Sequence, residues 1–262
     1  MQKRHQNYNQ YFEEQVISTK KYIIPYIEGL KPLTASTFVM EVGCGEGGNL
    51  LPFCELGCQC TGIDIDTPKI EVGRQRLSQY NVQFFCQDIY TLQPADNLQF
   101  DIIFLKDVIE HIHNQDKFIG FIRQFLKPDG IIFFAFPPFR MPFGGHQQIL
   151  ENKFLSKLPY FHLLPKSLYA AVLKASKLIP AGVEHMLDIK KTGISIHRFQ
   201  KIAKKNHFFI KKDTHWFINP NYETKFSLKP RQLPLLLRFP FLKDFYTTCY
   251  WCIIQPQNTA KV

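Results

Sequence analysis

Short apolar runs alternate with segments of helical periodicity along the first half of this chain. The apolar runs are rich in Val, Ile and Phe and predict buried strands, while the segments between them space their apolar residues as helices do. Such alternation indicates a mostly parallel sheet covered by helices on both faces. The sequence therefore predicts an α/β fold with a doubly wound sheet, with strands at 37–42, 59–64, 81–85, 100–105 and 130–136 and helices at 47–56, 68–79 and 115–126.

Different patterns flank this core. Residues 10–29 predict an amphipathic helix that covers the sheet, and Pro25 is expected to kink or split it. After Pro137 and Pro138 the residues up to 194 form an insertion, in which 163–179 predicts a helix with one apolar face and a lysine-bearing face opposite. This helix either packs over the site as a lid, which we favour, or lies on a membrane surface.

The last part of the chain returns to the pattern of the core. Ser195 is a candidate cap for a helix that ends near 206, a strand is expected across 207–218, and a last strand follows a loop at 219–244. The chain thus divides into an N-terminal helical cover (1–30), a Rossmann-like core (31–137), a basic helical insertion (138–194) and a segment that completes the sheet (195–262).

Chemistry is concentrated at the carboxyl ends of the predicted strands. The first strand runs into the glycine turn Gly43-Cys44-Gly45-Glu46-Gly47-Gly48, which lets a ligand approach the backbone closely. Taken alone, this turn also satisfies the G-x-G-x-x-G pattern of NAD-binding domains. However, Glu41, Asp64 and Asp88 end the first three strands, and acids at this edge favour a cationic ligand over a pyrophosphate.

Five motifs occur in a familiar order between residues 37 and 136. They are E-V-G-C-G-E-G from Glu41, G-I-D from Gly62, Q-D at Gln87, F-D-I-I-F-L-K-D-V-I-E-H from Phe100 and L-K-P-D-G from Leu126. In this order they resemble the class I S-adenosylmethionine-dependent methyltransferases, in the broad group that acts on small molecules and quinones. The resemblance implies a seven-stranded, Rossmann-like sheet whose last two strands form an antiparallel pair, with the helical insertion after the fifth strand.

The resemblance also implies a set of residues that bind S-adenosylmethionine. Glu41, Gly43, Cys44 and Gly45 would contact the methionine part of the cofactor. Asp64, followed by Ile65, would hold the ribose hydroxyls, and Asp88, followed by Ile89, would face the adenine. The backbone of Leu105 and Lys106 would line the other side of the cofactor, and S-adenosylhomocysteine would be the product.

The expected reaction is methyl transfer to a small-molecule or lipid-linked acceptor, at oxygen. A hydroxyl acceptor must lose a proton, and histidine is a suitable base near neutral pH. His146 follows the fifth strand beside two glycines and is the first candidate, with His111 as the second or as a structural residue. Glu110 and His111 resemble the E-H pair of quinone-biosynthesis O-methyltransferases, which has been linked to a divalent ion. The sequence places no further ligands beside them, so no metal site is expected.

The uneven distribution of charge along the chain allows a second class of methyl acceptor. Residues 1–139 hold 12 Lys and Arg against 16 Asp and Glu, whereas residues 140–262 hold 20 against 6. A basic half favours an anionic partner, so an RNA methyltransferase is the alternative, with nucleic acid ranked below a small molecule. A protein that binds the cofactor without turnover is the third possibility. The lysines that motivate the RNA hypothesis are Lys201, Lys204, Lys205, Lys211 and Lys212.

Cysteine usage and hydropathy indicate a cytoplasmic location. The seven cysteines are odd in number and fall mostly on predicted buried elements, so they are expected to be free thiols. No apolar run reaches the roughly 18 residues of a membrane span, and the first residues lack the apolar core of a signal peptide.

Overall fold

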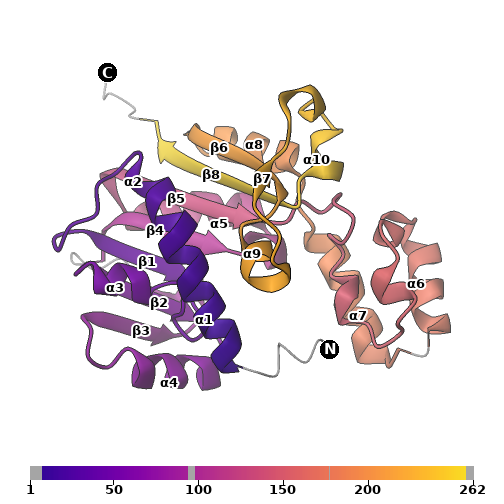
Figure 1. The fold of residues 1–262 in the computed structure, drawn as a ribbon, viewed down its shortest axis with the longest axis horizontal. Coiled ribbons are helices and arrows are strands. Elements are labelled where there is room, and N and C mark those ends of the chain that lie inside the picture. Colours follow the sequence, from indigo (N-terminus) through magenta and orange to yellow (C-terminus); the bar gives the residue numbers. More distant parts are fainter. Residues whose placement is uncertain (1–7, 94–97, 177, 258–262) are drawn as a thin grey trace.

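A computed structural model describes residues 8–93, 98–176 and 178–257. Its centre is one mixed sheet with the strand order β3-β2-β1-β4-β5-β8-β6-β7 (Figure 1). The first five strands are parallel to one another, as predicted. They are β1 (Phe38–Val42), β2 (Gln59–Asp64), β3 (Val82–Cys86), β4 (Phe100–Lys106) and β5 (Leu126–Phe136).

The fifth strand begins four residues before its predicted start. Leu126 pairs with Phe100, the register then shifts, and Ile131 pairs with Ile102. The L-K-P-D-G motif is therefore an irregularity at the beginning of β5 rather than a separate loop. Pro128 and the exposed Asp129 hid this extension from the apolar pattern, because strands rarely contain such residues in their interior.

The described part of the sheet has eight strands, not the seven expected. Strand β8 (Cys249–Pro256) lies antiparallel between β5 and β6 (Phe208–Ile218), so the predicted antiparallel pair is confirmed. The eighth strand is β7 (Arg231–Gln232), which pairs with the outer edge of β6. Two residues cannot show the alternation that marks a strand, so this segment was expected to be a loop. The same connection also carries α9 (Asn221–Phe226), a 3-10 turn η9 (Leu235–Leu237) and α10 (Lys243–Tyr246).

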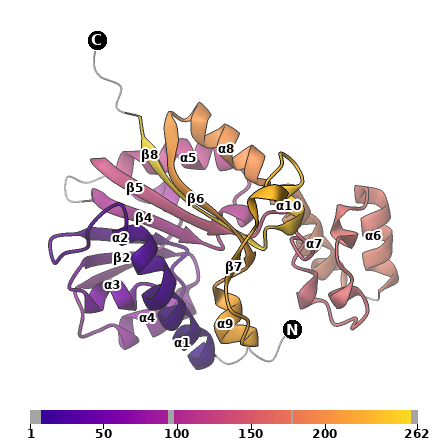
Figure 2. The same cartoon turned by 45° about the horizontal axis from the view of Figure 1, so that its top comes forward.

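Helices cover both faces of the sheet (Figures 1 and 2). Helices α1 (Tyr8–Ser18), α2 (Ile24–Glu28), α3 (Leu51–Glu55) and α4 (Thr67–Arg76) bury their apolar residues in one core cluster. On the opposite face α5 (Gln115–Ile122) and α8 (Ile196–Lys205) contribute to the other core cluster. Ser195 caps α8 by accepting a hydrogen bond from the Arg198 N–H at 3.1 Å, as expected.

The predicted N-terminal helix is split. Its α-helical parts α1 and α2 are separated by a π-helical turn η2 (Thr19–Ile23), and Pro25 lies at the start of α2. Proline has no backbone N–H to continue an α-helical hydrogen-bond ladder, which explains a break at this point.

The insertion folds around a small core of its own. The helix expected at 163–179 is shorter, α6 (Lys166–Ala175), and a second helix α7 begins at Pro180 and runs to Thr192. Pro165 directly precedes α6, and both prolines suit these helix starts. Tyr169 and Leu173 of α6 pack with Val183 and Met186 of α7, so most of the apolar face of α6 is covered within the protein. Figure 1 shows both helices beyond the edge at which β1–β5 end.

Two hydrogen-bonded contacts fasten this insertion to the core. The buried Gln115 side chain at the start of α5 donates to the Thr192 carbonyl at 2.5 Å and to the Ile109 carbonyl at 3.1 Å. His113 Nε2 lies 3.1 Å from an Asp188 carboxylate oxygen on α7. The end of α7 is therefore held against the segment that follows β4.

The remaining expectations concern cysteines and membrane spans. All seven cysteines are free, and six of them are buried. Across the part of the chain that the structure describes, every helix is too short or too polar to cross a bilayer.

His162 makes the stability of the insertion pH-dependent. The side chain is fully buried, its Nε2 lies 2.7 Å from the Phe139 carbonyl oxygen, and burial lowers its pKa to about 4. The unfolded chain has a histidine pKa near 6.5, so it binds more protons than the folded chain between these values. This contribution to stability is present above about pH 6.5 and is lost as the pH falls towards about pH 4.

We therefore expect the urea midpoint to fall between about pH 7 and about pH 4.5, with His162 contributing about 2 kcal/mol of the pH-dependent change in unfolding free energy. His162→Gln should lower the midpoint at neutral pH and flatten this dependence, whereas His207→Asn, at an exposed position, should retain the slope. Equal slopes for wild type and His162→Gln in equilibrium urea unfolding would exclude this role.

Candidate functional site

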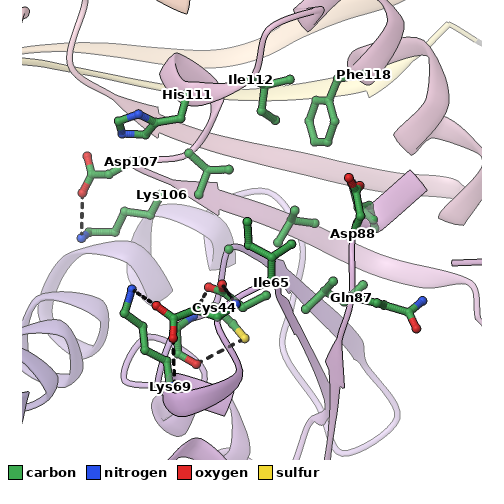
Figure 3. Close-up of a pocket in the computed structure, with 18 of the residues that line it drawn as sticks. Cys44, Ile65, Lys69, Gln87, Asp88, Lys106, Asp107, His111, Ile112 and Phe118 are labelled. Carbon is green, nitrogen blue, oxygen red and sulfur yellow. Dashed lines mark hydrogen bonds and ion pairs between the residues drawn. The ribbon is translucent and has the colours of Figure 1, made fainter. Parts of the chain in front are cut away.

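A cavity of about 1100 Å³ opens at the carboxyl ends of β1, β2, β3 and β4 (Figure 3). The motif acids Glu46, Asp64, Asp88 and Asp107 contribute to its wall, together with residues of α1, α4 and α5, whereas Glu41 and Glu110 do not. Ligands of doubly wound sheets bind at this edge. The cavity is lined by Tyr11, Gln15, Val42–Glu46, Asn49, Ile63–Asp66, Lys69, Gln87–Tyr90, Lys106–Val108, His111–Asn114, Lys117 and Phe118.

The glycine turn presents backbone to this cavity. Gly43 and Gly45 have φ angles of 74° and 52°, in the left-handed region that favours glycine. A Cβ on Gly43 would lie 2.4 Å from a Val108 methyl carbon, so the turn has no room for a side chain there. The N–H groups of Gly43 and Cys44 both donate to the Ile63 carbonyl, at 2.8 and 3.1 Å, which fastens the turn to β2.

Asp64 fixes the same turn from the end of β2. One carboxylate oxygen accepts the Gly45 N–H at 2.7 Å and the other accepts the Asp66 N–H at 2.9 Å. Each oxygen still has a second lone pair for a ligand hydroxyl. Asp64 therefore holds the glycine turn in a fixed position relative to the end of β2.

Glu41 lies behind the cavity rather than in its wall. It is fully buried, one oxygen accepts from the Asn49 amide at 2.8 Å, and the other has no hydrogen-bond partner among the described residues. Burial raises the pKa of its carboxyl well above the usual value, although Asn49 opposes this effect. Asn49 itself lines the cavity, so Glu41 reaches the site through this amide.

Apolar side chains form a slot at the far end of the cavity. Its lining includes Ile65, Ile89, Ile112 and Phe118. Figure 3 shows Asp88, which follows β3, on the same side of the cavity as Phe118. Ile65 is 76% exposed, which is unusual for an apolar side chain that lines a cavity. Such an arrangement suits a flat apolar ring with a polar edge.

Residues at the end of β4 form another part of the cavity wall. Leu105 is buried and does not line the cavity, whereas Lys106 and Asp107 do. Lys106 Nζ lies 3.2 Å from an Asp107 carboxylate oxygen. Burial by itself would lower the pKa of Lys106, but the charge and hydrogen bond of Asp107, with further contributions from Tyr11 and Cys249, together raise it. Asp107 has a φ of 57°, an uncommon conformation for a non-glycine residue.

Acidic groups outnumber lysines in the lining of the whole larger cavity. Five carboxylates line the cavity against three ammonium groups, and Lys69 and Lys106 are each paired with one of those carboxylates. A net negative wall stabilises a cationic ligand and repels a pyrophosphate. The acids are Glu46, Asp64, Asp66, Asp88 and Asp107, and the lysines are Lys69, Lys106 and Lys117.

A second cavity of about 380 Å³ adjoins the first. It lies between the end of β5, the insertion and α9, and in both views α9 stands between α1 and the insertion (Figures 1 and 2). Met141, Phe143 and His146 line it from the insertion, and Tyr222 lines it from α9. Five residues belong to both cavities and so mark where they meet: Tyr11, Gln15, Lys106, Asp107 and His111.

His111 and His146 face each other at this junction. Their ring centroids are 5.0 Å apart, with the rings nearly perpendicular. Burial lowers the pKa of both histidines, that of His146 to about 4 with a further contribution from His111. Both imidazoles are therefore neutral at neutral pH. His146 adopts a φ of 55°, so the loop carries it in a left-handed conformation.

Glu110 completes a cluster that the sequence did not predict. Ligand atoms of Glu110, His111 and His146 all lie within 4.8 Å of one another. Glu110 is buried, neither of its oxygens has a hydrogen-bond partner among the described residues, and burial raises its pKa well above the usual value. His146 is 35 positions after His111 in the chain, and only the folded insertion brings them together. No spacing pattern links such residues.

Sequence reasoning also missed several wall residues of the two cavities. Tyr11 and Gln15 come from α1, whose general covering role was expected, but no motif marks them. Asn49 and Asp107 lie within the quoted motifs or directly after them, so their positions were a usable signal.

Comparisons with known proteins agree with this architecture. Residues 40–134 match the model of a family described as a methyltransferase domain. A ubiquinone biosynthesis O-methyltransferase from Coxiella burnetii is 29% identical over 201 residues, which are 72% of this chain and 76% of that protein.

Solved structures share the fold. PKMT2 from Rickettsia typhi, in complex with AdoHcy, superposes with a TM-score of 0.56 at 18% identity, over 92% of this chain and 54% of that longer chain. The PH0226 protein from Pyrococcus horikoshii gives a TM-score of 0.56 at 16% identity, over 92% of this chain and 91% of its own.

The family model covers the strands that build the larger cavity, and the five motifs fall in the same region. The matching fold places those motifs at one edge of the sheet. Residues 40–134 therefore form a methyltransferase domain, and this domain, the relative and the shared fold together support an S-adenosylmethionine-dependent methyltransferase of class I.

Proposed function

We propose that this enzyme transfers a methyl group from S-adenosylmethionine to an oxygen of a small-molecule or lipid-linked acceptor. The observation that carries the proposal is the meeting of two cavities at Lys106, Asp107 and His111. The larger cavity has an acidic wall and a backbone turn, and the smaller one contains two neutral imidazoles. The name of the relative from Coxiella burnetii supports an O-methyltransferase.

The wall of the larger cavity supports the following orientation of the cofactor. Gly43, Cys44 and Gly45 would bind the methionine part along their backbone, with Glu41 acting through Asn49. Asp64, next to Ile65, would accept the ribose hydroxyls with its free lone pairs. The adenine would occupy the slot beside Ile89, where Asp88 accepts from its amino group. The backbone of Lys106, rather than that of the buried Leu105, would follow the opposite side, so the sulfonium would lie near Asp107.

This orientation directs the methyl group towards the smaller cavity. In the displacement, a new bond forms between the acceptor oxygen and the methyl carbon while the bond from that carbon to sulfur breaks. S-adenosylhomocysteine leaves as a neutral thioether. Alignment of oxygen, methyl and sulfur supplies much of the acceleration.

His146 would take the proton of the acceptor hydroxyl. Its low pKa keeps it neutral at neutral pH, so it accepts a hydrogen bond from the hydroxyl and holds the oxygen in line. An oxygen that gains a methyl group becomes strongly acidic, so a weak base suffices to remove its proton. His111, which lines both cavities, would orient the acceptor from the other side.

The cluster around His146 also fits a divalent cation. Glu110 offers a buried carboxylate without a partner, and His111 and His146 offer neutral imidazoles, a donor set that suits such ions. A bound cation would lower the pKa of an acceptor hydroxyl. With a cation bound, Glu110, His111 and His146 would be its ligands, so His146 would act as a ligand in place of a base. Asp107 lies in the wall of both cavities beside them.

The structure gives little support to the RNA alternative. Lys205 pairs with Asp116 at 2.5 Å, and Lys212 lies 3.9 Å from the Tyr26 ring centroid while it donates to the Tyr26 carbonyl. These two lysines therefore have structural partners. A small acceptor remains the better fit to a cavity of about 380 Å³.

Asp64→Ala should weaken S-adenosylmethionine binding by about 100-fold, because two charge-assisted hydrogen bonds to the ribose are lost. Calorimetric titration measures the change. Asp129→Ala, at an exposed position before the main part of β5, is the matched control and should bind as wild type does. Unchanged affinity in Asp64→Ala would contradict the ribose assignment.

His146→Gln should reduce turnover by about 10²-fold or more and leave cofactor affinity within about twofold, because the residue lines the smaller cavity but not the larger one. The assay follows label from methyl-labelled S-adenosylmethionine into lipid, small-molecule, RNA and protein fractions of an extract. His207→Asn serves as control. Full activity of His146→Gln would remove it as the base, and label in RNA alone would overturn the proposed acceptor class.

A further inference from the structure

The connection between β7 and β8 exposes a run of large apolar side chains. Leu235 and Leu236 are 79% and 81% exposed, the highest values among the large apolar residues of the described chain. Five more exposed apolar residues follow within ten positions. We call the whole set the 235–246 patch, and it consists of Leu235, Leu236, Leu237, Phe239, Phe241, Leu242 and Tyr246.

The chain holds this patch in a fixed shape. Leu233 is buried at one end, and its N–H donates to the His215 carbonyl at 2.7 Å. Asp244 and Thr247 are buried at the other end. Between them the leucines form the turn η9, and Arg238 Nε donates to the Leu233 carbonyl at 2.9 Å. The exposed side chains therefore project from a braced turn.

Basic residues surround the apolar ones. Lys229, Arg231, Arg238 and Lys243 lie within residues 227–243, a stretch that has no acidic residue. Among the described residues no close ion pair joins any of these four to a carboxylate, although the charge of Lys243 acts on Asp213 and Asp244 and that of Lys229 on Glu223. Arg140 adds a further cation, with its guanidinium 5.9 Å from the Phe241 ring centroid. The nearest acid in sequence, Asp244, is buried.

This combination matches the surface of a membrane. Protruding leucines and phenylalanines insert among acyl chains, while neighbouring lysines and arginines bind anionic headgroups. Such a set of exposed large apolar side chains with cations among them is unusual for a surface that faces only water.

The patch lies near the smaller cavity. Tyr160 of the insertion donates to the Phe245 carbonyl at 3.2 Å, and Thr248, two residues after Tyr246, lines that cavity. In Figures 1 and 2, α10 lies beside the insertion. A surface that docks on lipid at this place brings the acceptor cavity close to the bilayer.

We propose that the 235–246 patch docks the enzyme on the surface of an anionic phospholipid bilayer. The leucines and phenylalanines enter the outer part of the acyl region, and the surrounding lysines and arginines contact the headgroups. The acceptor is then a lipid-soluble molecule that enters the smaller cavity from the bilayer, a consequence that rests on the proposed function.

Co-sedimentation of the full chain with vesicles tests the docking without any acceptor. Wild type should bind phosphatidylglycerol-containing vesicles at least about tenfold more tightly than phosphatidylcholine vesicles, and salt should weaken the binding. The double variant Leu235→Ser and Leu236→Ser should bind at least about tenfold more weakly. Phe154→Ser, which removes an apolar side chain that is 73% exposed on the insertion, should bind as wild type does.

Calorimetry with S-adenosylmethionine shows whether each variant is folded, since neither change touches the larger cavity. Equal vesicle binding by wild type and the leucine double variant would overturn the docking surface, as would no binding to either vesicle. Association of wild type into dimers that the double variant abolishes, without vesicle binding, would assign the patch to a second copy of the chain instead. Vesicle binding together with label only in water-soluble products would keep the docking surface and reject the lipid-soluble acceptor.

Discussion

The bracing of the glycine turn against β2 is the constraint on which the site depends. Gly43 and Cys44 donate to the Ile63 carbonyl, and the Asp64 carboxylate accepts from Gly45. These bonds fix the end of β1 relative to the end of β2 and leave lone pairs of Asp64 for a ligand. Because the turn has no room for a Cβ at Gly43, backbone rather than side chains forms this wall. The acids at the neighbouring strand ends then give the cavity its negative character.

The acceptor side is built by a different part of the chain. The insertion supplies His146 and apolar wall residues, and its attachment through Gln115 and His113 holds it over the end of β4. Glu110, His111 and His146 meet only because of this attachment. The larger cavity is thus built by the motif-bearing strand ends and the smaller one mainly by the insertion and α9, an arrangement in which the site can vary on one fold.

The sequence predicted the cofactor half well for a physical reason. Strands β1–β4 are short, apolar and bounded by turn residues or acids, so their periodicity and their carboxyl-end motifs are local signals. The antiparallel position of β8 followed from the resemblance. Strand β7 and the early start of β5 were missed, since two residues carry no period and Pro128 interrupts the apolar pattern.

The residues of the site likewise divide into those that local sequence signals predicted and those that they did not. Asp64, Asp88 and the glycine turn lie in the cavity wall as expected, whereas Glu41 and Leu105 lie behind it. The Glu41 side chain points to Asn49 and not into the cavity, and this direction depends on side-chain packing that the motif does not encode. The histidine and glutamate cluster depends on the fold of an insertion that carries no motif, and the 235–246 patch depends on which apolar residues remain uncovered. These features arise from tertiary contacts and not from spacing along the chain.

The central claim is that an acidic strand edge selects a sulfonium donor over a nicotinamide dinucleotide. Calorimetric titration of the purified chain with S-adenosylmethionine, and separately with NADH, tests it most directly. We expect saturable binding of S-adenosylmethionine, displaced by S-adenosylhomocysteine, and no heat of binding for NADH. Binding of NADH without binding of S-adenosylmethionine would contradict it.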